Sequence, residues 1–209
     1  MKIQKIAVFR SPFASKFGVP RQSGLVPELP GSIVFEPEFR CADSLRGIEG
    51  FDYLWLIWGF SLGSGWSPTV RPPVLGGNER MGVWATRSPF RPNPLGLSSV
   101  RLERVEWDTA GGPVLHVLGG DLVDGTPVYD IKPYVPFSDA HPDAKGGFAA
   151  PHAAERLHVL VPESVARRFA ESELHVLKEV LACDPRPRYH NDPERVYGRP
   201  FRGMEVRVK

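Results

Sequence analysis

Residues 81–105 read MGVWATRSPFRPNPLGLSSVRLERV, and this stretch decides the fold class. Two short strand-like runs, 81–85 and 100–105, flank a loop that contains three prolines. Proline fixes its own φ and pushes the preceding residue to an extended conformation, so the loop is ordered in advance. Runs of the same kind recur at residues 3–9, 32–36, 53–60, 113–118 and 125–132. About seven short strands separated by turn residues indicate a barrel or sandwich rather than alternating βα units.

The end of the chain has a different pattern. Residues 138–155 are small and polar and contain proline and glycine, which suggests a linker. Residues 163–182 form the one long helical stretch, with a break expected near Ser172, and residues 203–209 have a strand pattern. We therefore predict a β domain over residues 1–145 and a small α+β domain over residues 146–209.

Composition excludes several classes of protein. No apolar run is long enough to span a membrane. The two cysteines lie far apart in sequence, so neither a zinc site nor a disulfide framework is predicted. This use of cysteine is typical of a protein in a reducing cytoplasm. The six histidines are scattered, so no metal site is expected, and both phosphate-binding glycine motifs are missing. The formal net charge is only +2, yet residues 184–209 hold seven basic and four acidic side chains. This basic tail points to a polyanionic partner, although a solvated charged surface explains it as well.

Two stretches carry candidate functional side chains. The rigid loop after residue 85 holds the guanidinium groups of Arg87 and Arg91, which are suited to binding carboxylates or phosphates. Salt bridges on a stiff surface loop are the alternative. Asp121, Asp124 and Asp130 lie within ten residues, where carboxylates could bind ribose hydroxyls, accept an ammonium group or take a proton. Ordinary capping of Asp-Gly turns is the alternative for each of them.

Five motifs together resemble one known family. They are TRSPFRPNPLGLS at 86–98, DLVDGTPVYDIKPYVPF at 121–137, PRQ at 20–22, RPPVLGGN at 71–78 and DPRPRY at 184–189. The chain resembles the TsaA-like family over nearly its whole length. This resemblance implies a seven-stranded antiparallel β-barrel distinct from the Rossmann fold, working as a homodimer. It also implies methylation, dependent on S-adenosylmethionine, of N6 of threonylcarbamoyladenosine beside the anticodon (position 37) of threonine tRNA.

The resemblance further implies site residues. Cofactor contacts are expected from Pro20, Arg21, Gln22, Phe60, Ser61, Arg87, Leu97, Asp121, Leu122, Val123 and Asp124. Asp124 is the candidate general base or orienting acceptor; the alternative is that no side chain takes the proton until transfer is complete. We further predict, from the residues themselves, that the anticodon stem-loop of the tRNA contacts Arg91 and, on the tail, Arg186, Arg188 and Tyr189, because arginines beside an aromatic ring suit a phosphate backbone and an unstacked base. The cofactor pocket is then formed by the barrel alone. The alternative is that the tail arginines pair with Asp184, Asp192 and Glu194 and pin the tail to the barrel.

The sequence leaves two alternative functions open. A module that binds S-adenosylmethionine or RNA without catalysis would carry the same motifs, and so would a methyltransferase with a different substrate. The aromatic strand 53–60 and Trp66 are plausible material for a dimer interface.

Overall fold

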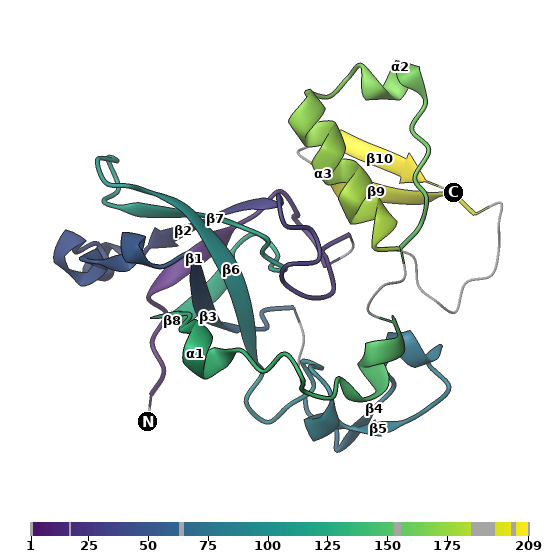
Figure 1. Cartoon of the computed structure of the whole chain (residues 1–209), viewed down its shortest axis with the longest axis horizontal. Helices are drawn as coiled ribbons and strands as arrows, with labels where there is room; N and C mark the ends of the chain where they lie inside the picture. The colour runs from purple at the N-terminus through teal and green to yellow at the C-terminus, as the bar shows by residue number, and fades with distance from the viewer. Residues whose placement is uncertain are drawn as a thin grey trace.

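The computed structural model describes residues 2–16, 18–62, 65–152, 156–184, 195–201 and 204–208 (Figure 1). Six strands close into a barrel in the order β1-β2-β7-β6-β3-β8, and every neighbouring pair is antiparallel. Their bounds are β1 Ala7–Arg10, β2 Pro30–Phe35, β3 Tyr53–Gly59, β6 Leu95–Glu106, β7 Val114–Leu118 and β8 Thr126–Pro133. The predicted mainly β barrel is confirmed, but its strand count was wrong by one.

The miscounted strand is residues 81–85, which lie outside the barrel. Here β5 (Met81–Gly82) pairs with β4 (Thr69–Val70) in a separate two-stranded sheet, and Figure 1 shows this sheet apart from the barrel. Residues Val83–Ala85 form a 3-10 turn. A barrel strand must bury alternate side chains, whereas this run buries only Val83.

The barrel core follows the alternation of its strands. On β3, the side chains of Leu54, Leu56 and Trp58 point inward and are buried. Gly96 on β6 is the direct partner of Trp58, and a Cβ atom built on Gly96 would lie 2.2 Å from the Trp58 ring. The missing side chain of Gly96 therefore makes room for the indole of Trp58.

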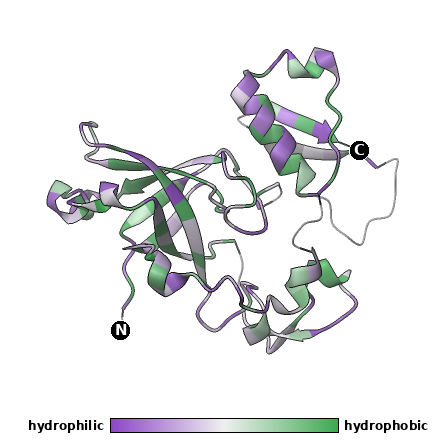
Figure 2. Ribbon diagram, in the orientation of Figure 1, coloured by the Kyte–Doolittle hydropathy of each residue, from purple (hydrophilic) through white to green (hydrophobic). Residues whose placement is uncertain are grey.

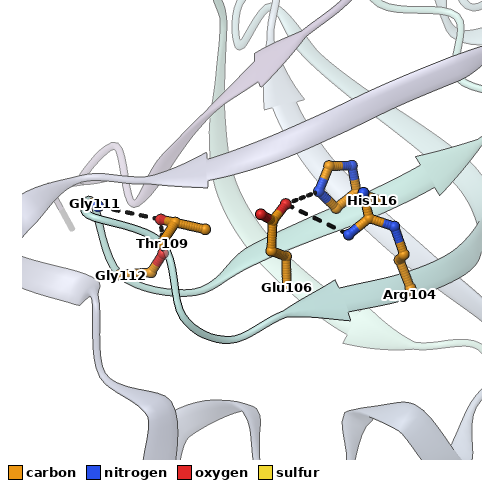
Figure 3. A network of polar contacts seen from close by, with 6 residues as sticks. All are labelled: Arg104, Glu106, Thr109, Gly111, Gly112 and His116. Atoms are coloured by element: carbon orange, nitrogen blue, oxygen red, sulfur yellow. Dashed lines mark hydrogen bonds and ion pairs between the residues drawn. The ribbon is translucent and has the colours of Figure 1, made fainter.

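A polar network closes the β6–β7 hairpin at its far end (Figure 3). The Glu106 carboxylate lies 2.7 Å from Nε2 of His116 and 3.4 Å from Nη1 of Arg104. The hydrogen bond with His116 is the main reason why the pKa of Glu106 is lowered from its ordinary value. Thr109 stabilises the turn by donating its hydroxyl to the carbonyl of Gly112. His116 is thus a hydrogen-bond partner of Glu106 on the barrel surface.

The remaining elements follow the barrel. They are the short helix α1 (Pro136–Asp139), helices α2 (Glu163–Ala166) and α3 (Glu171–Ala182), and the antiparallel pair β9 (Tyr197–Phe201) and β10 (Met204–Val208). The 3-10 turns are Pro37–Phe39, Ala42–Leu45, Ile48–Gly50, Pro73–Leu75, Val83–Ala85 and Gly147–His152. The predicted helix 163–182 is interrupted at residues 167–170, slightly before the expected break, and the Glu173 carboxylate caps the new start by accepting the Ala170 N–H at 3.2 Å.

A second hydrophobic core joins the barrel to the C-terminal unit, by which we mean residues 156–184, 195–201 and 204–208. Phe13, Val26 and Leu29, from the irregular segment between β1 and β2, pack in this core. Their buried partners in the C-terminal unit are Val176, Leu177, Val180, Leu181 and Phe201. The segment between β1 and β2 therefore lies between the barrel and the C-terminal unit.

Among the described residues, no helix is long and apolar enough to cross a membrane.

Candidate functional site

Four segments that carry predicted site residues meet at one end of the barrel. The backbone N–H of Gly24 donates to the carbonyl of Gly119 at 2.8 Å, which ties the loop after Pro20 to the turn that holds Asp121. The N–H of Ser99 on β6 donates to the Ser23 hydroxyl at 3.2 Å. The N–H of Phe60, just after β3, donates to the carbonyl of Pro94 at 2.9 Å. The barrel topology thus gathers residues that are up to a hundred positions apart in sequence.

Arg87 is held at this junction by a side chain from another segment. Its Nη1 donates to Oε1 of Gln22 at 2.5 Å, while the guanidinium stays exposed. Burial raises the pKa of Asp121, and the positive charge of Arg87 opposes this rise, so the two groups lie within electrostatic range of each other. The structure therefore brings together three of the predicted cofactor contacts, from three separate motifs.

Asp121 is the end of a hydrogen-bonded chain that begins in the barrel core. The indole Nε1 of Trp58 donates to the Ser98 hydroxyl at 2.9 Å, and that hydroxyl donates to Oδ1 of Asp121 at 2.5 Å. Ser98 is only 1% exposed. Burial raises the pKa of Asp121 above its ordinary value, although the Ser98 hydrogen bond and the charge of Arg87 oppose this. The result is a partly buried carboxylate fixed in orientation by Ser98.

Sequence reasoning missed Ser98 and Trp58 as members of the site. A signal was present, because β6 buries Gly96, Ser98 and Val100 in alternation. A hydroxyl at an inward position of a strand needs a partner inside the barrel. The period-2 pattern could therefore have predicted that Ser98 contacts a polar group from a neighbouring segment.

Asp124 lies in a different environment from Asp121. Its Oδ1 accepts the backbone N–H of Ser11 at 3.1 Å, and its Oδ2 lies 3.5 Å from Nη1 of Arg10. Its own N–H donates to the carbonyl of Phe13 at 2.8 Å. These contacts anchor the segment that follows β1, so the carboxylate predicted as general base is engaged with the backbone and a cation.

Arg91 is also engaged with its own loop. Its Nη1 donates to the carbonyls of Val83 at 3.0 Å and Thr86 at 2.7 Å. Its guanidinium carbon lies 5.1 Å from the centre of the Trp84 ring, within the range of a cation–π contact. Arg91 therefore braces the proline-rich loop from within, whereas Arg87 points to Gln22.

The other predicted contacts fall into three groups. Leu97 and Ser61 are exposed, and Phe60 packs edge-on against Trp58 with ring centres 4.5 Å apart. Leu122 is buried in the barrel core, and Val123 accepts hydrogen bonds from Thr126 through its carbonyl, so both shape the turn. Pro20 is buried and Arg21 donates to the carbonyl of Asp184 at 3.0 Å. Arg186, Arg188 and Tyr189 lie outside the described residues.

The loop that carries residues 20–22 is supported from both parts of the chain. In addition to the second core, Arg156 of the C-terminal unit donates to the carbonyl of Leu25 at 2.6 Å and pairs with Glu179 of α3 at 2.6 Å.

Within the described ranges, no group of three or more His, Cys, Asp and Glu side chains is arranged to hold a metal ion.

The fold and the site together define a class: a small closed antiparallel barrel, without a doubly wound sheet, whose loops converge on one carboxylate and one arginine. The chain matches the family model of the tRNA-methyltransferase O N-terminal domain over residues 8–140 and that of the TrmO C-terminal domain over residues 154–209. The chain belongs to this family, and the predicted resemblance is confirmed.

Individual relatives agree with this assignment. The tRNA (adenine(37)-N6)-methyltransferase of Escherichia coli K12 is 45% identical over 202 residues, which are 92% of this chain and 85% of the relative. A Pyrococcus abyssi relative, called a probable S-adenosyl-L-methionine-binding protein, is 36% identical over 143 residues, covering 68% of this chain and 73% of that one. The crystal structure of TrmO from Pseudomonas aeruginosa superposes with a TM-score of 0.77 at 34% identity, covering 99% of this chain and 91% of that one.

Proposed function

We propose that the protein methylates N6 of the modified adenosine at position 37 of tRNA, with S-adenosylmethionine as methyl donor. The substrate we propose is threonylcarbamoyladenosine in threonine tRNA, and the setting is the cytoplasm. One observation carries this proposal: the loop of residues 20–24, Arg87 and the Ser98-bound carboxylate of Asp121 converge at one end of the barrel. Three of the motifs that carry the family resemblance are thus joined by direct hydrogen bonds.

The side chains at this junction fit the chemistry of the cofactor. S-adenosylmethionine presents a carboxylate, an ammonium group, ribose hydroxyls and a flat apolar base. Arg87 would bind the carboxylate, and Asp121 would accept hydrogen bonds from ribose hydroxyls or the ammonium group. Exposed Leu97 and the partly buried Phe60 supply apolar surface for the base. When bound, the cofactor supplies an electrophilic methyl group on a sulfonium sulfur.

The contribution of the chain to the reaction is alignment. A transferred methyl group and the attacking nitrogen must be held in line at about 3–3.5 Å. The proline-braced loop supplies this rigidity, because Arg91 ties it to the carbonyls of Val83 and Thr86 and Gln22 fixes Arg87. A loop ordered before binding has less conformational entropy to lose when substrates arrive.

Proton acceptance from N6 is the second contribution. Asp121 is assigned to the cofactor, and the carboxylate of Asp124 contacts Arg10 and the backbone N–H of Ser11. Asp124 therefore remains the candidate acceptor for the proton, with loss of the proton to water after transfer as the alternative.

Homodimerisation is part of the proposal. The outward face of β3 and β6 presents Tyr53, Ile57 and Leu97, of which Tyr53 and Leu97 are exposed. Leu97 also belongs to the site, so a partner placed on this face would lie beside the cofactor. Light scattering at micromolar concentration tests this: a particle with the mass of one chain and full activity would contradict it.

The function itself is tested by mass spectrometry of nucleosides. Threonine tRNA is incubated with the protein and S-adenosylmethionine, and digested nucleosides are compared with a reaction lacking protein. Conversion of threonylcarbamoyladenosine to its N6-methyl form supports the proposal, and tRNA without the threonylcarbamoyl group is the matched control. Calorimetry with S-adenosylmethionine and a chelator runs in parallel. Binding heat without any methylated nucleoside would indicate a non-catalytic module, and methylation of another nucleoside would indicate a different substrate.

A further inference from the structure

The segment between β3 and β6 forms an excursion from the barrel and exposes large aromatic side chains. We use "excursion" for residues 60–62 and 65–94. Trp66 is 55% exposed, Trp84 67% and Phe90 45%. Figure 2 shows hydrophobic residues in this part of the chain as well as along the barrel strands. Aromatic side chains of this size are seldom left exposed in a group without a binding role.

Trp84 contacts both Trp66 and Arg91. The rings of Trp66 and Trp84 have centres 6.5 Å apart and an interplanar angle of 23°. The guanidinium of Arg91 lies over the Trp84 ring and is fixed by two backbone carbonyls. Backbone hydrogen bonds hold the stacked parts together, from the N–H of Val83 to the carbonyl of Pro68 at 3.0 Å and from the N–H of Ser67 to that of Phe90 at 3.2 Å.

The charge of the excursion favours a polyanion as its occupant. Between residues 60 and 94 the sequence has four arginines and a single acidic residue, Glu79. A second copy of the chain seated here by two-fold symmetry would bring two like-charged surfaces together. A nucleic acid would gain from the same charges, and its bases stack on aromatic rings.

We propose that Trp66, Trp84 and Arg91 form a stacking platform for an unpaired base of an RNA loop. This inference rests on the proposed function, because it names the surface by which the tRNA substrate is recognised. Trp84 lies in the 3-10 turn that leads into the proline-braced loop, three residues before Arg87, so the platform and the side chain assigned to the cofactor belong to one continuous segment. The platform thus replaces our prediction of Trp66 as dimer-interface material.

The test measures binding of an RNA hairpin with the anticodon loop of threonine tRNA, in the absence of S-adenosylmethionine. Stacking on an aromatic side chain contributes about 1–3 kcal/mol per base, so Trp84→Ala is expected to weaken binding roughly five- to hundredfold. Trp84→Phe keeps a ring and should retain most of the affinity. Trp107→Ala is the matched control, since Trp107 is 37% exposed and lies at the end of the β6–β7 hairpin.

Three results of the hairpin-binding and light-scattering measurements would overturn the platform. The first is hairpin affinity of both Trp66→Ala and Trp84→Ala within twofold of the wild-type protein. The second is a loss of affinity in Trp107→Ala as large as that in Trp84→Ala. The third is a change of oligomeric state in Trp84→Ala by light scattering, which would identify this face as an interface between copies of the chain.

The binding assay keeps the platform separate from the proposed reaction. If the hairpin binds through Trp84 but no nucleoside is methylated, the platform stands and the proposed function fails. If threonine tRNA is methylated and Trp84→Ala leaves the Michaelis constant for tRNA unchanged, the function stands and the platform fails.

Discussion

Replacing Ser98 with alanine tests whether the chain from Trp58 to Asp121 holds the site together. The change removes one hydroxyl that accepts from the indole at 2.9 Å and donates to the carboxylate at 2.5 Å. A buried donor left without an acceptor costs about 1–3 kcal/mol, and a hydrogen bond to a charged group contributes about 1.5–3 kcal/mol. Asp121 keeps some access to water, so most of the loss comes from Trp58. We expect the free energy of unfolding to fall by about 2–3 kcal/mol, because these terms are not fully additive.

Thermal unfolding followed by circular dichroism measures this loss. For a chain of this size, 1 kcal/mol corresponds to a Tm shift of roughly 2–4 °C, so a decrease of roughly 4–12 °C is expected. Ser99→Ala is the matched control, because Ser99 is on the outward face of the same strand and contacts Ser23 through its backbone N–H. S-adenosylmethionine affinity, measured by calorimetry, should also fall for Ser98→Ala. If Ser98→Ala and Ser99→Ala had the same Tm and the same affinity, the reasoning about this chain would be refuted.

Three further predictions concern charge. Asp121→Asn should raise Tm at neutral pH, because burial raises the pKa of Asp121 and its ionised form costs folding free energy, and this variant should bind S-adenosylmethionine more weakly. The gain in Tm should shrink as the pH falls from above the raised pKa of Asp121 toward the ordinary pKa of an aspartate. An equal gain in Tm at all pH values would contradict the raised pKa. Arg87→Ala should weaken S-adenosylmethionine binding roughly ten- to hundredfold, from the loss of a charge-assisted hydrogen bond, with Tm unchanged; an affinity within twofold by calorimetry would make Arg87 a surface residue. Replacing Arg186 and Arg188 together by alanine should raise the Michaelis constant for tRNA and flatten its salt dependence, because fewer counterions are released; a lower Tm with an unchanged salt slope would instead mean that they pin the tail.

Much of the barrel could be predicted because its strands obey a simple periodicity. Residues 53–60 and 100–105 alternate or cluster apolar side chains; residues 53–59 form β3, and residues 100–105 lie in β6. Residues 81–85 look equally strand-like, but only Met81–Gly82 form a strand, which pairs locally with Thr69–Val70 instead of joining the barrel. A run of five residues does not specify its partner strand, which explains the error of one in the strand count.

The site was less predictable than the fold. The motifs around Gln22, Arg87 and Asp121 were recognised as strings of residues, and the structure shows that they meet. The role of Ser98 depends on barrel closure, since its partners come from β3 and from the turn after β7. The second core was missed for a related reason: Phe13 and Val26 lie in an irregular segment, where no repeating spacing marks a buried face.

That second core couples the order of the loop bearing Gln22 to the packing of the C-terminal unit. The loop bearing Gln22 packs against α3 through Phe13 and Val26 and is held by Arg156. A partner that binds the C-terminal unit only in this packed arrangement would order the loop, and would therefore strengthen cofactor binding. Linkage is reciprocal, so the cofactor would strengthen binding of that partner by the same factor. The order in which the two substrates bind would then change the path of assembly but leave the free energy of the ternary complex the same.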